Sequence, residues 1–202
     1  MARRRISDAL KGEGIAPGMK IGLFGGSFDP VHKGHLHVAE TARRRLGLDQ
    51  VWWLVSPQNP LKARRAGDFA DRLRTVKQRA GGKGMVVSDI EARLGTRYTA
   101  DLVDRLRQRF PRTHFVWVMG GDNLRHFHRW HRWQDILAAL PVAVVSRPQD
   151  PIKAQLSIMA RCYARSRRRE GEAKKLPLTK LPAWTYLTEP LQSVSSTALR
   201  AR

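Results

Sequence analysis

Residues 24–35 read FGGSFDPVHKGH, and they decide the fold because a glycine-rich turn here separates an apolar strand from an amphipathic helix. The preceding residues 21–24 are typical of a buried strand, and apolar side chains recur at helical spacing after the turn. Gly25 and Gly26 permit backbone conformations that are closed to other residues, and they let main-chain N–H groups approach a ligand. A helix that begins near Gly34 adds unpaired N–H groups and a positive dipole end. The stretch therefore predicts a phosphate-binding site.

Two histidines within this stretch supply its chemistry. His32 and His35 stand three residues apart, so both rings can reach one group of oxygen atoms if the first helical turn begins between them. Taken alone, a His-x-x-His pair is more often solvated or part of a core than part of a site. Its place beside GGSFDP at the end of a strand favours a phosphate-binding pair, and neither ring needs a metal ion for that role.

The rest of the chain alternates strands with helices. Strands are expected at residues 51–55, 85–90, 114–119, 142–146 and 184–187, and helices at residues 71–80, 99–110 and 150–168, with a further helix that ends at residue 140. Such alternation requires crossover connections, which favour a mostly parallel sheet with helices on both faces. We therefore predict a single doubly wound α/β domain over residues 20–202, preceded by a flexible basic extension, residues 1–19.

In a doubly wound sheet, ligands bind beyond the carboxyl ends of the strands, where the winding reverses. The turn in residues 24–35, SPQNPLK in 56–62, GGDN in 120–123 and SVSSTALR in 193–200 would all fall on that edge. Their agreement on one edge is a stronger indication of a site than any one of them.

The segment SVSSTALR has the pattern of a helix start. Ser195 suits an N-cap, Ser196 and Thr197 would occupy the first turn, and Arg200 would share their face. Alone, this pattern is an ordinary structural cap. Beside the histidine turn, it predicts a second anion site.

Length and composition limit the class of protein. At 202 residues and 23.0 kDa the chain supports one core, and no apolar run approaches the ~20 residues of a membrane span. The N-terminus lacks the apolar segment of a secretory signal, which favours a cytoplasmic protein without a membrane partner. Cys162 is the only cysteine, and we expect a buried or idle thiol. No Cys/His cluster has zinc spacing, so no protein-bound metal is predicted.

Net charge is the unusual quantity. Lysine and arginine number 38 against 17 acidic residues, which gives +21 and a pI near 11.5. Such a charge raises a nucleic-acid hypothesis. The basic residues are dispersed, however, and no nucleic-acid-binding module is recognisable, so no dedicated nucleic-acid partner is expected. The charge should instead speed the capture of polyphosphate ligands. The oligomeric state does not follow from the sequence.

The motifs GGSFDPVHKGH and SSTALR resemble those of the nucleotidyltransferase superfamily, and residues 20–202 are similar in motif order to bacterial nicotinate-nucleotide adenylyltransferases. The resemblance implies a Rossmann-like fold and an enzyme of NAD biosynthesis. Such an enzyme joins nicotinate mononucleotide to ATP, with Mg2+ as cofactor, and releases deamido-NAD and pyrophosphate. A phosphomonoester is already ionised at neutral pH, so this chemistry needs no general base. It needs two anions held in line and stabilisation of the developing charge.

The resemblance also assigns site residues. ATP would contact Gly25, Gly26, Ser27, Phe28, His32, His35, Asp122, Ser195, Ser196, Thr197 and Arg200. His32 and His35 would be catalytic, with His35 nearest the α-phosphate. Nicotinate mononucleotide would contact Gly26, Ser27, Lys62, Tyr98, Thr99 and Trp130.

Several of these assignments compete with structural roles. Trp130 can stack on an electron-poor ring or pack in a core, whereas the helix start at Tyr98 and Thr99 can accept a carboxylate. Asp122 could contact a ribose or cap the following helix, and Lys62 could be an ordinary exposed lysine. The rival functions are adenylyl transfer to nicotinamide mononucleotide or phosphopantetheine, and RNA binding without catalysis.

Overall fold

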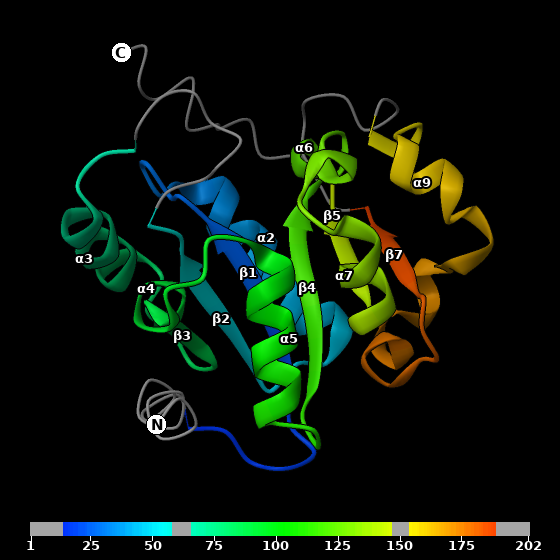
Figure 1. The fold of residues 1–202 in the computed structure, drawn as a ribbon, viewed down its shortest axis with the longest axis horizontal. Helices are drawn as coiled ribbons and strands as arrows, with labels where there is room; N and C mark the ends of the chain where they lie inside the picture. The colour runs from blue at the N-terminus through cyan, green and yellow to red at the C-terminus, as the bar shows by residue number, and fades with distance from the viewer. Residues whose placement is uncertain (1–13, 58–65, 147–153, 189–202) are drawn as a thin grey trace.

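The glycine-rich turn follows strand β1 (Lys20–Gly26), which lies inside a parallel sheet. The fold is that of a computed structural model, which describes residues 14–57, 66–146 and 154–188. The other strands are β2 (Gln50–Val55), β3 (Met85–Ser88), β4 (His114–Gly120), β5 (Val142–Val145), β6 (Arg167–Arg168) and β7 (Trp184–Leu187). They are ordered β3-β2-β1-β4-β5-β7-β6, and each neighbouring pair is parallel (Figure 1). The predicted doubly wound α/β fold is therefore confirmed.

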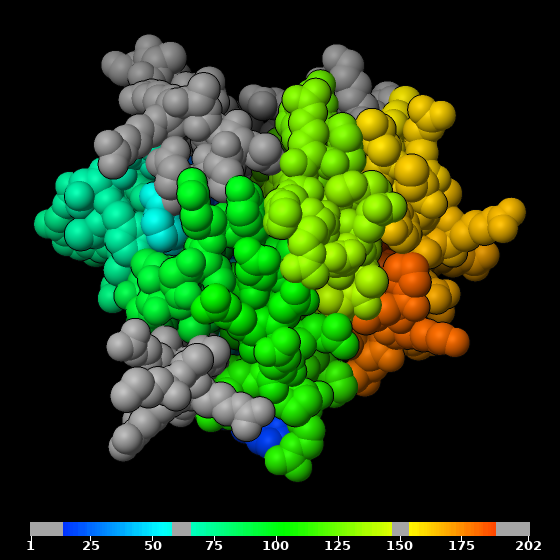
Figure 2. Space-filling view, in the orientation of Figure 1, coloured from blue at the N-terminus to red at the C-terminus, as the bar shows by residue number. Residues whose placement is uncertain are grey.

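Helices connect the strands. The α-helices are α2 (Lys33–Leu46), α3 (Phe69–Arg79), α4 (Ile90–Leu94), α5 (Thr99–Arg109), α6 (Gly121–Leu124), α7 (Trp133–Ala139) and α9 (Ile158–Cys162). Short 3-10 helices are η1 (Phe127–Arg129), η2 (Ala164–Ser166) and η3 (Glu170–Leu178). In the view of Figures 1 and 2, α5 and the yellow-green segment around α7 cover the near face of the sheet, and α2 lies behind it.

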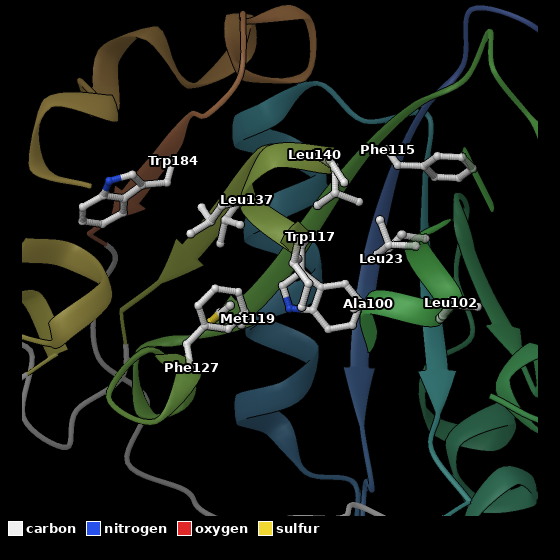
Figure 3. Packing of buried hydrophobic residues seen from close by; sticks show 14 of the residues in the cluster. Leu23, Ala100, Leu102, Phe115, Trp117, Met119, Phe127, Leu137, Leu140 and Trp184 are labelled. Carbon is white, nitrogen blue, oxygen red and sulfur yellow. The ribbon is translucent and has the colours of Figure 1, made fainter. Parts of the chain in front are cut away.

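Side chains alternate between the two faces because successive residues of a strand point in opposite directions. On β4, Phe115, Trp117 and Met119 enter the core beneath α5 and α7, whereas Val116 and Val118 enter the core beneath α2. Figure 3 shows the first of these cores, with Trp117 near its middle. The sheet is thus buried on both sides, as its continuous apolar strands predict.

Two predicted elements differ from the structure. The expected strand 85–90 ends at Ser88, because Ile90 instead begins α4 and its N–H donates to Ser88 Oγ at 3.2 Å. The expected long helix 150–168 is wrong for the residues described: Ser157 caps the five-residue α9, and Arg167 pairs with β7 as a strand. A serine cap in mid-segment thus breaks a pattern that composition alone presents as continuous.

Cys162, the last residue of α9, is exposed and free. Of the two expected alternatives, a buried thiol or an idle one, the buried thiol is therefore wrong, and the idle thiol stays a prediction.

The winding reverses between β1 and β4. From β1 the chain proceeds through β2 to β3 on one side, and from β4 through β5 to β7 on the other. Gly26 and Gly120 end the two strands at the reversal, which is where such sheets bind ligands. Strands β2 and β7 end at the same edge. The chain leaves the described ranges just beyond this edge, after Pro57 and after Thr188.

The far edge of the sheet is strand β6, which has only two residues. Arg167 and Arg168 are both exposed. The guanidinium of Arg167 lies 5.3 Å from the ring centroid of Trp184 and 5.9 Å from that of Tyr186. These contacts hold a charged side chain over the last aromatic residues of the sheet.

Part of the predicted N-terminal extension lies against the domain. Ile15 and Met19 pack on the core beneath α5, and the Gly18 N–H donates to the Arg112 carbonyl oxygen at 2.7 Å. Residues 1–13 lie outside the described residues, so their flexibility stays a prediction. Across the ranges that are described, no helix is both long and apolar enough to cross a membrane.

Candidate active site

The turn after β1 depends on two missing side chains. A Cβ atom on Gly25 would lie 2.7 Å from Cη2 of Trp117, and one on Gly26 would lie 3.0 Å from the ring of Phe28. Neither glycine has a positive φ, whereas Phe28 does, at 46°. The expected reason for these glycines, a conformation closed to other residues, is therefore wrong. They are needed because a buried indole and a buried phenyl ring leave no space beside them.

His32 and His35 cap the start of α2. The Nδ1 atom of His32 accepts from the Gly34 N–H at 3.1 Å, and the Nδ1 atom of His35 accepts from the His32 N–H at 3.2 Å. The pair thus forms a capping box in which imidazoles replace the usual hydroxyl and carboxylate. The helix begins at Lys33, between the two histidines, and their ring centroids are 3.8 Å apart. The expected placement of both rings at one helix start is confirmed.

These hydrogen bonds determine which ring nitrogen carries the proton. A nitrogen that accepts a hydrogen bond carries no hydrogen, so the network assigns the proton of each neutral ring to Nε2. Each ring can then donate to an anion without being charged. His32 is 3% exposed, and the ring of His35 meets that of Phe28 edge-on at 5.1 Å between centroids. Packing therefore fixes both rings in orientation.

Phe28 anchors the turn to the core. Its left-handed backbone costs about 1–2 kcal/mol for a residue with a Cβ atom. Its ring is 2% exposed and lies 5.4 Å from the ring of Phe24 and 5.2 Å from that of Trp53. Burial of such a ring stabilises by about 1.5–3 kcal/mol, which offsets the strain. Any contact between Phe28 and a ligand must therefore come from main-chain atoms.

Ser56 and Glu91 meet at the same edge. The segment that begins at Ser56 was expected there, whereas Glu91 was not. The Ser56 N–H donates to the Gly26 carbonyl oxygen at 3.0 Å, which ties the end of β2 to the turn. Glu91 lies in the first turn of α4. Burial raises the pKa of Glu91 to about 7, against the opposing effect of a hydrogen bond with the Ser56 side chain. Glu91 therefore carries a proton more often than a solvated glutamate does.

We expect Glu91→Gln to be more stable than the native protein at pH 8 and equal to it near pH 4. The pKa of Glu91 rises from 4.5 in the unfolded chain to about 7 in the folded one. Between these values the folded state binds more protons, so the native free energy of unfolding falls as the pH rises, by about 3 kcal/mol in total. Urea unfolding of both proteins at several pH values measures the difference. Parallel stability curves would contradict it, and the exposed Glu40→Gln supplies a control.

A second group of predicted residues lies at the start of α5. Tyr98 is the N-cap residue of α5 and is 38% exposed, and Thr99 is the first residue of the helix. The ring of His131 lies over that of Tyr98, with centroids 4.4 Å apart and a tilt of 35°. The helix start predicted at Tyr98 and Thr99 is confirmed. The stacked His131 was not expected as a partner of Tyr98, because only the fold brings the two together.

Trp130 connects the start of α5 to the glycine-rich turn after β1. It is partly buried and meets Trp117 edge-on, with ring centroids 5.8 Å apart. Trp117 is the same indole that excludes a side chain from Gly25. One buried residue therefore contacts both predicted subsites.

The loop that carries Trp130 is fastened to α5 by Arg132, a residue with φ of 51°. Its guanidinium lies 3.5 Å from Asp101 and 3.1 Å from Asp104 of α5, and 2.7 Å from Asp135 of α7. Pairs of this kind are individually weak at the surface, but here one fork joins three carboxylates. The network fixes the loop beside the α5 start.

Asp122 lies in the first turn of α6, directly after β4. The N-cap residue of α6 is Gly120, so the alternative in which Asp122 caps this helix is wrong. Its position at the reversal point agrees with a ligand contact. The remaining predicted site residues, Lys62, Ser195, Ser196, Thr197 and Arg200, lie outside the described residues.

Comparison with known proteins settles the family. The sequence profile described as cytidylyltransferase-like matches residues 23–202. A probable nicotinate-nucleotide adenylyltransferase of a Caulobacter species is 53% identical over 185 residues, which cover 91% of this chain and 98% of the relative. The chain belongs to the nicotinate-nucleotide adenylyltransferase family. A further member, from Parvibaculum lavamentivorans, is 47% identical over 203 residues, covering 100% of this chain and 97% of that protein.

Solved structures share the fold of this adenylyltransferase family member. The nicotinic acid mononucleotide adenylyltransferase of Plasmodium falciparum complexed with NaAD has a TM-score of 0.67 and 18% identity, over 91% of this chain and 83% of that chain. The structure of the Plasmodium falciparum enzyme complexed with APC has a TM-score of 0.65, with the same identity and coverage. At this identity the likeness concerns the fold, and it confirms the Rossmann-like nucleotidyltransferase architecture.

For an adenylyltransferase of this family, Mg2+ is the expected cofactor. In the parts of the chain that the structure describes, no group of three or more His, Cys, Asp or Glu residues could hold a metal ion. The site offers imidazole and main-chain N–H groups, which suit phosphate oxygens, whereas Mg2+ prefers oxygen ligands. The described residues therefore fit a magnesium ion held through substrate phosphates and not by a protein cage.

Proposed function

We propose that this protein transfers the adenylyl group of ATP to nicotinate mononucleotide, giving deamido-NAD and pyrophosphate in NAD biosynthesis. One observation carries the proposal: two imidazoles that cap α2 lie at the reversal point of the sheet, where sheets of this kind bind their ligands. Family membership supports the substrate pair, since relatives bear the corresponding name and a structure of the same fold holds NaAD.

In this reaction a phosphate oxygen of nicotinate mononucleotide attacks the α-phosphorus of ATP. A new P–O bond forms there, and the bond from the α-phosphorus to the bridging oxygen breaks, so that its electron pair leaves with pyrophosphate. No proton must move, because the attacking phosphate is ionised. The protein has to align two anions and to stabilise the charge that builds up on the phosphorus and the departing group.

The phosphate turn and α2 meet these requirements. We assign His35 to the reacting α-phosphate and His32 to a neighbouring phosphate, each donating from Nε2. Gly25, Gly26 and Ser27, with the main chain of Phe28, would line the same phosphates, and Asp122 would contact the ribose of ATP. When bound with ATP, Mg2+ supplies further neutralisation of the phosphate charge.

The far end of the triphosphate is assigned to Ser195, Ser196, Thr197 and Arg200. Support comes from β7, which ends at the edge where the phosphate turn lies, and the chain continues beyond Thr188. The seven residues from there to Ser195 can span at most ~25 Å when extended. That reach is sufficient for the predicted cap to meet a triphosphate.

The cytoplasmic location of the protein stays a prediction.

The pyridine nucleotide is assigned to the start of α5 and to Trp130. Main-chain N–H groups at Thr99 and the helix dipole suit a carboxylate, and the partly exposed Tyr98 lies beside them. Trp130 would stack on the pyridine ring, while Lys62, Gly26 and Ser27 would contact the ribose phosphate. The carboxylate contact favours nicotinate mononucleotide over its amide and over phosphopantetheine.

We expect Trp130→Ala to raise the KM for nicotinate mononucleotide about tenfold, because an aromatic pair is worth about 0.5–1.5 kcal/mol beyond its buried area. The KM for ATP should change less than twofold. Steady-state kinetics with each substrate varied in turn give both values. Trp133→Phe is the matched control, since Trp133 packs on Phe127 and Tyr163 in the core and should leave both constants unchanged. Equal rises in both constants for Trp130→Ala would assign that residue to core packing.

Pyrophosphate release tests the function as a whole. The protein is incubated with ATP and Mg2+ and with nicotinate mononucleotide, nicotinamide mononucleotide or phosphopantetheine. Release with the first, at the highest kcat/KM, is the expected result. Preference for another acceptor would reassign the substrate, and tight salt-sensitive RNA binding without any turnover would support the non-catalytic rival.

A further inference from the structure

Arg72 belongs to none of the motifs used above, yet it is a buried cation beside the phosphate turn. It lies in α3 and is only 5% exposed. Its Nη1 donates to the carbonyl oxygens of Ser27 at 2.7 Å and Ser56 at 2.9 Å. Its Nη2 donates to Pro57 at 2.9 Å and its Nε to Gly67 at 2.9 Å. One guanidinium therefore joins the turn after β1, the end of β2 and the chain before α3.

The partners of this cation are main-chain dipoles. Each of the hydrogen bonds given above goes to a carbonyl oxygen, and the carboxylates of Asp29 and Asp68 act on Arg72 electrostatically. Burial lowers the pKa of the guanidinium below its ordinary value, and those two carboxylates oppose the change. A buried charge is a poor source of stability compared with an apolar side chain of similar size. Arg72 instead fixes the relative positions of the turn after β1, the end of β2 and the chain before α3.

That arrangement includes the strained part of the turn. The Ser27 carbonyl that Arg72 holds belongs to the same peptide group as the Phe28 N–H, and planarity directs the two to opposite sides. Phe28 is the residue with a φ of 46°. Arg72 thus pins the peptide that precedes the left-handed residue, and the Phe28 N–H faces away from the cation.

We propose that Arg72 is a positioning residue for adenylyl transfer, which holds the Gly25–Phe28 turn and the end of β2 in the geometry that receives the triphosphate. The inference rests on the proposed function. It assigns to α3 a share in catalysis although α3 carries none of the residues expected to touch a substrate. Lysine cannot replace Arg72 in this role, because a single ammonium group has no planar fork with which to span the three segments.

The test compares Arg72→Lys with the native protein in pyrophosphate release at saturating ATP and nicotinate mononucleotide. We expect kcat per folded molecule to fall about 30-fold, since a displacement of the order of 1 Å at the reacting groups can cost up to a hundredfold. The KM for each substrate should change by a smaller factor than kcat does, and near-UV circular dichroism should match that of the native protein. The matched control is Arg74→Lys: Arg74 is on the same helix, 66% exposed and paired with Asp71, and its variant should match the native kcat.

The outcomes separate this inference from the proposed function. A native protein without turnover would overturn both. A native protein that turns over, with a folded Arg72→Lys of equal kcat, would overturn the role of Arg72 alone. An Arg72→Lys protein that does not fold, or whose activity falls only in proportion to its folded fraction, would assign Arg72 to stability and would equally overturn a positioning role.

Discussion

His35→Glu should fold as stably as the native protein and lose adenylyl transfer by about a thousandfold in kcat. Glutamate is a favoured residue at the third helical position of a capping box, so it can accept from the His32 N–H as His35 does. It cannot donate to a phosphate, and its charge repels the triphosphate. Removal of one donor to a developing anion costs about 10²–10³ in rate, and repulsion adds to that loss.

Two further variants separate the two roles of this ring. His35→Gln keeps an acceptor for the cap and an N–H donor, so it should retain native stability and lose less activity than His35→Glu. His35→Ala lacks both, and should lose about 1 kcal/mol of stability together with a kcat fall of about 10²–10³. Thermal unfolding and single-turnover pyrophosphate release measure the two effects. An unchanged kcat in His35→Glu would remove His35 from the mechanism.

Gly25→Val should destabilise the protein by about 3 kcal/mol and abolish activity. A Cβ atom at Gly25 would come within 2.7 Å of Trp117, whose side chain is 1% exposed and packed against Trp130. The rigid indole cannot withdraw, so the strand end and the turn must shift, and overpacking of this kind costs about 1–3 kcal/mol or more. Chemical denaturation gives the stability, and the pyrophosphate assay gives the activity.

The control and the falsifying result both follow from that contact. Gly171→Val is the matched control, because a Cβ atom there would meet nothing within 4 Å. In addition, Trp117→Phe should partly rescue Gly25→Ala, so that the double variant is more stable than the two single changes predict. Strict additivity would show that the indole does not set the size of residue 25.

The strands could be predicted because buried parallel strands are short, continuous apolar runs. The runs at 51–55, 114–119, 142–146 and 184–187 all appear as strands with shifts of one residue or none. The placement of residues 24–35 and 120–123 at one sheet edge followed from the same reasoning. The segment 150–168 could not be predicted, because a basic composition does not show that Ser157 starts a new helix or that Arg167 joins a strand.

The histidine turn was predictable as a site but not in its mechanics. Spacing indicated that His32 and His35 share a helix start. Only the structure shows that both Nδ1 atoms accept main-chain hydrogen bonds in the helix cap. Arg72 could not be found from sequence at all. In a helix with several basic residues it looks like a solvated side chain, and the carbonyl groups that hold it lie 5 to 45 residues away in the sequence.

The two-residue strand β6 has a consequence for how this sheet meets other molecules. An open sheet edge invites another chain to add a strand, and that is a common route to aggregation. Here the last edge is too short to template a ladder, and its two exposed guanidinium groups would face those of a second copy. Electrostatic repulsion at that border should therefore keep β7 from serving as a seed for intermolecular β-pairing at high protein concentration.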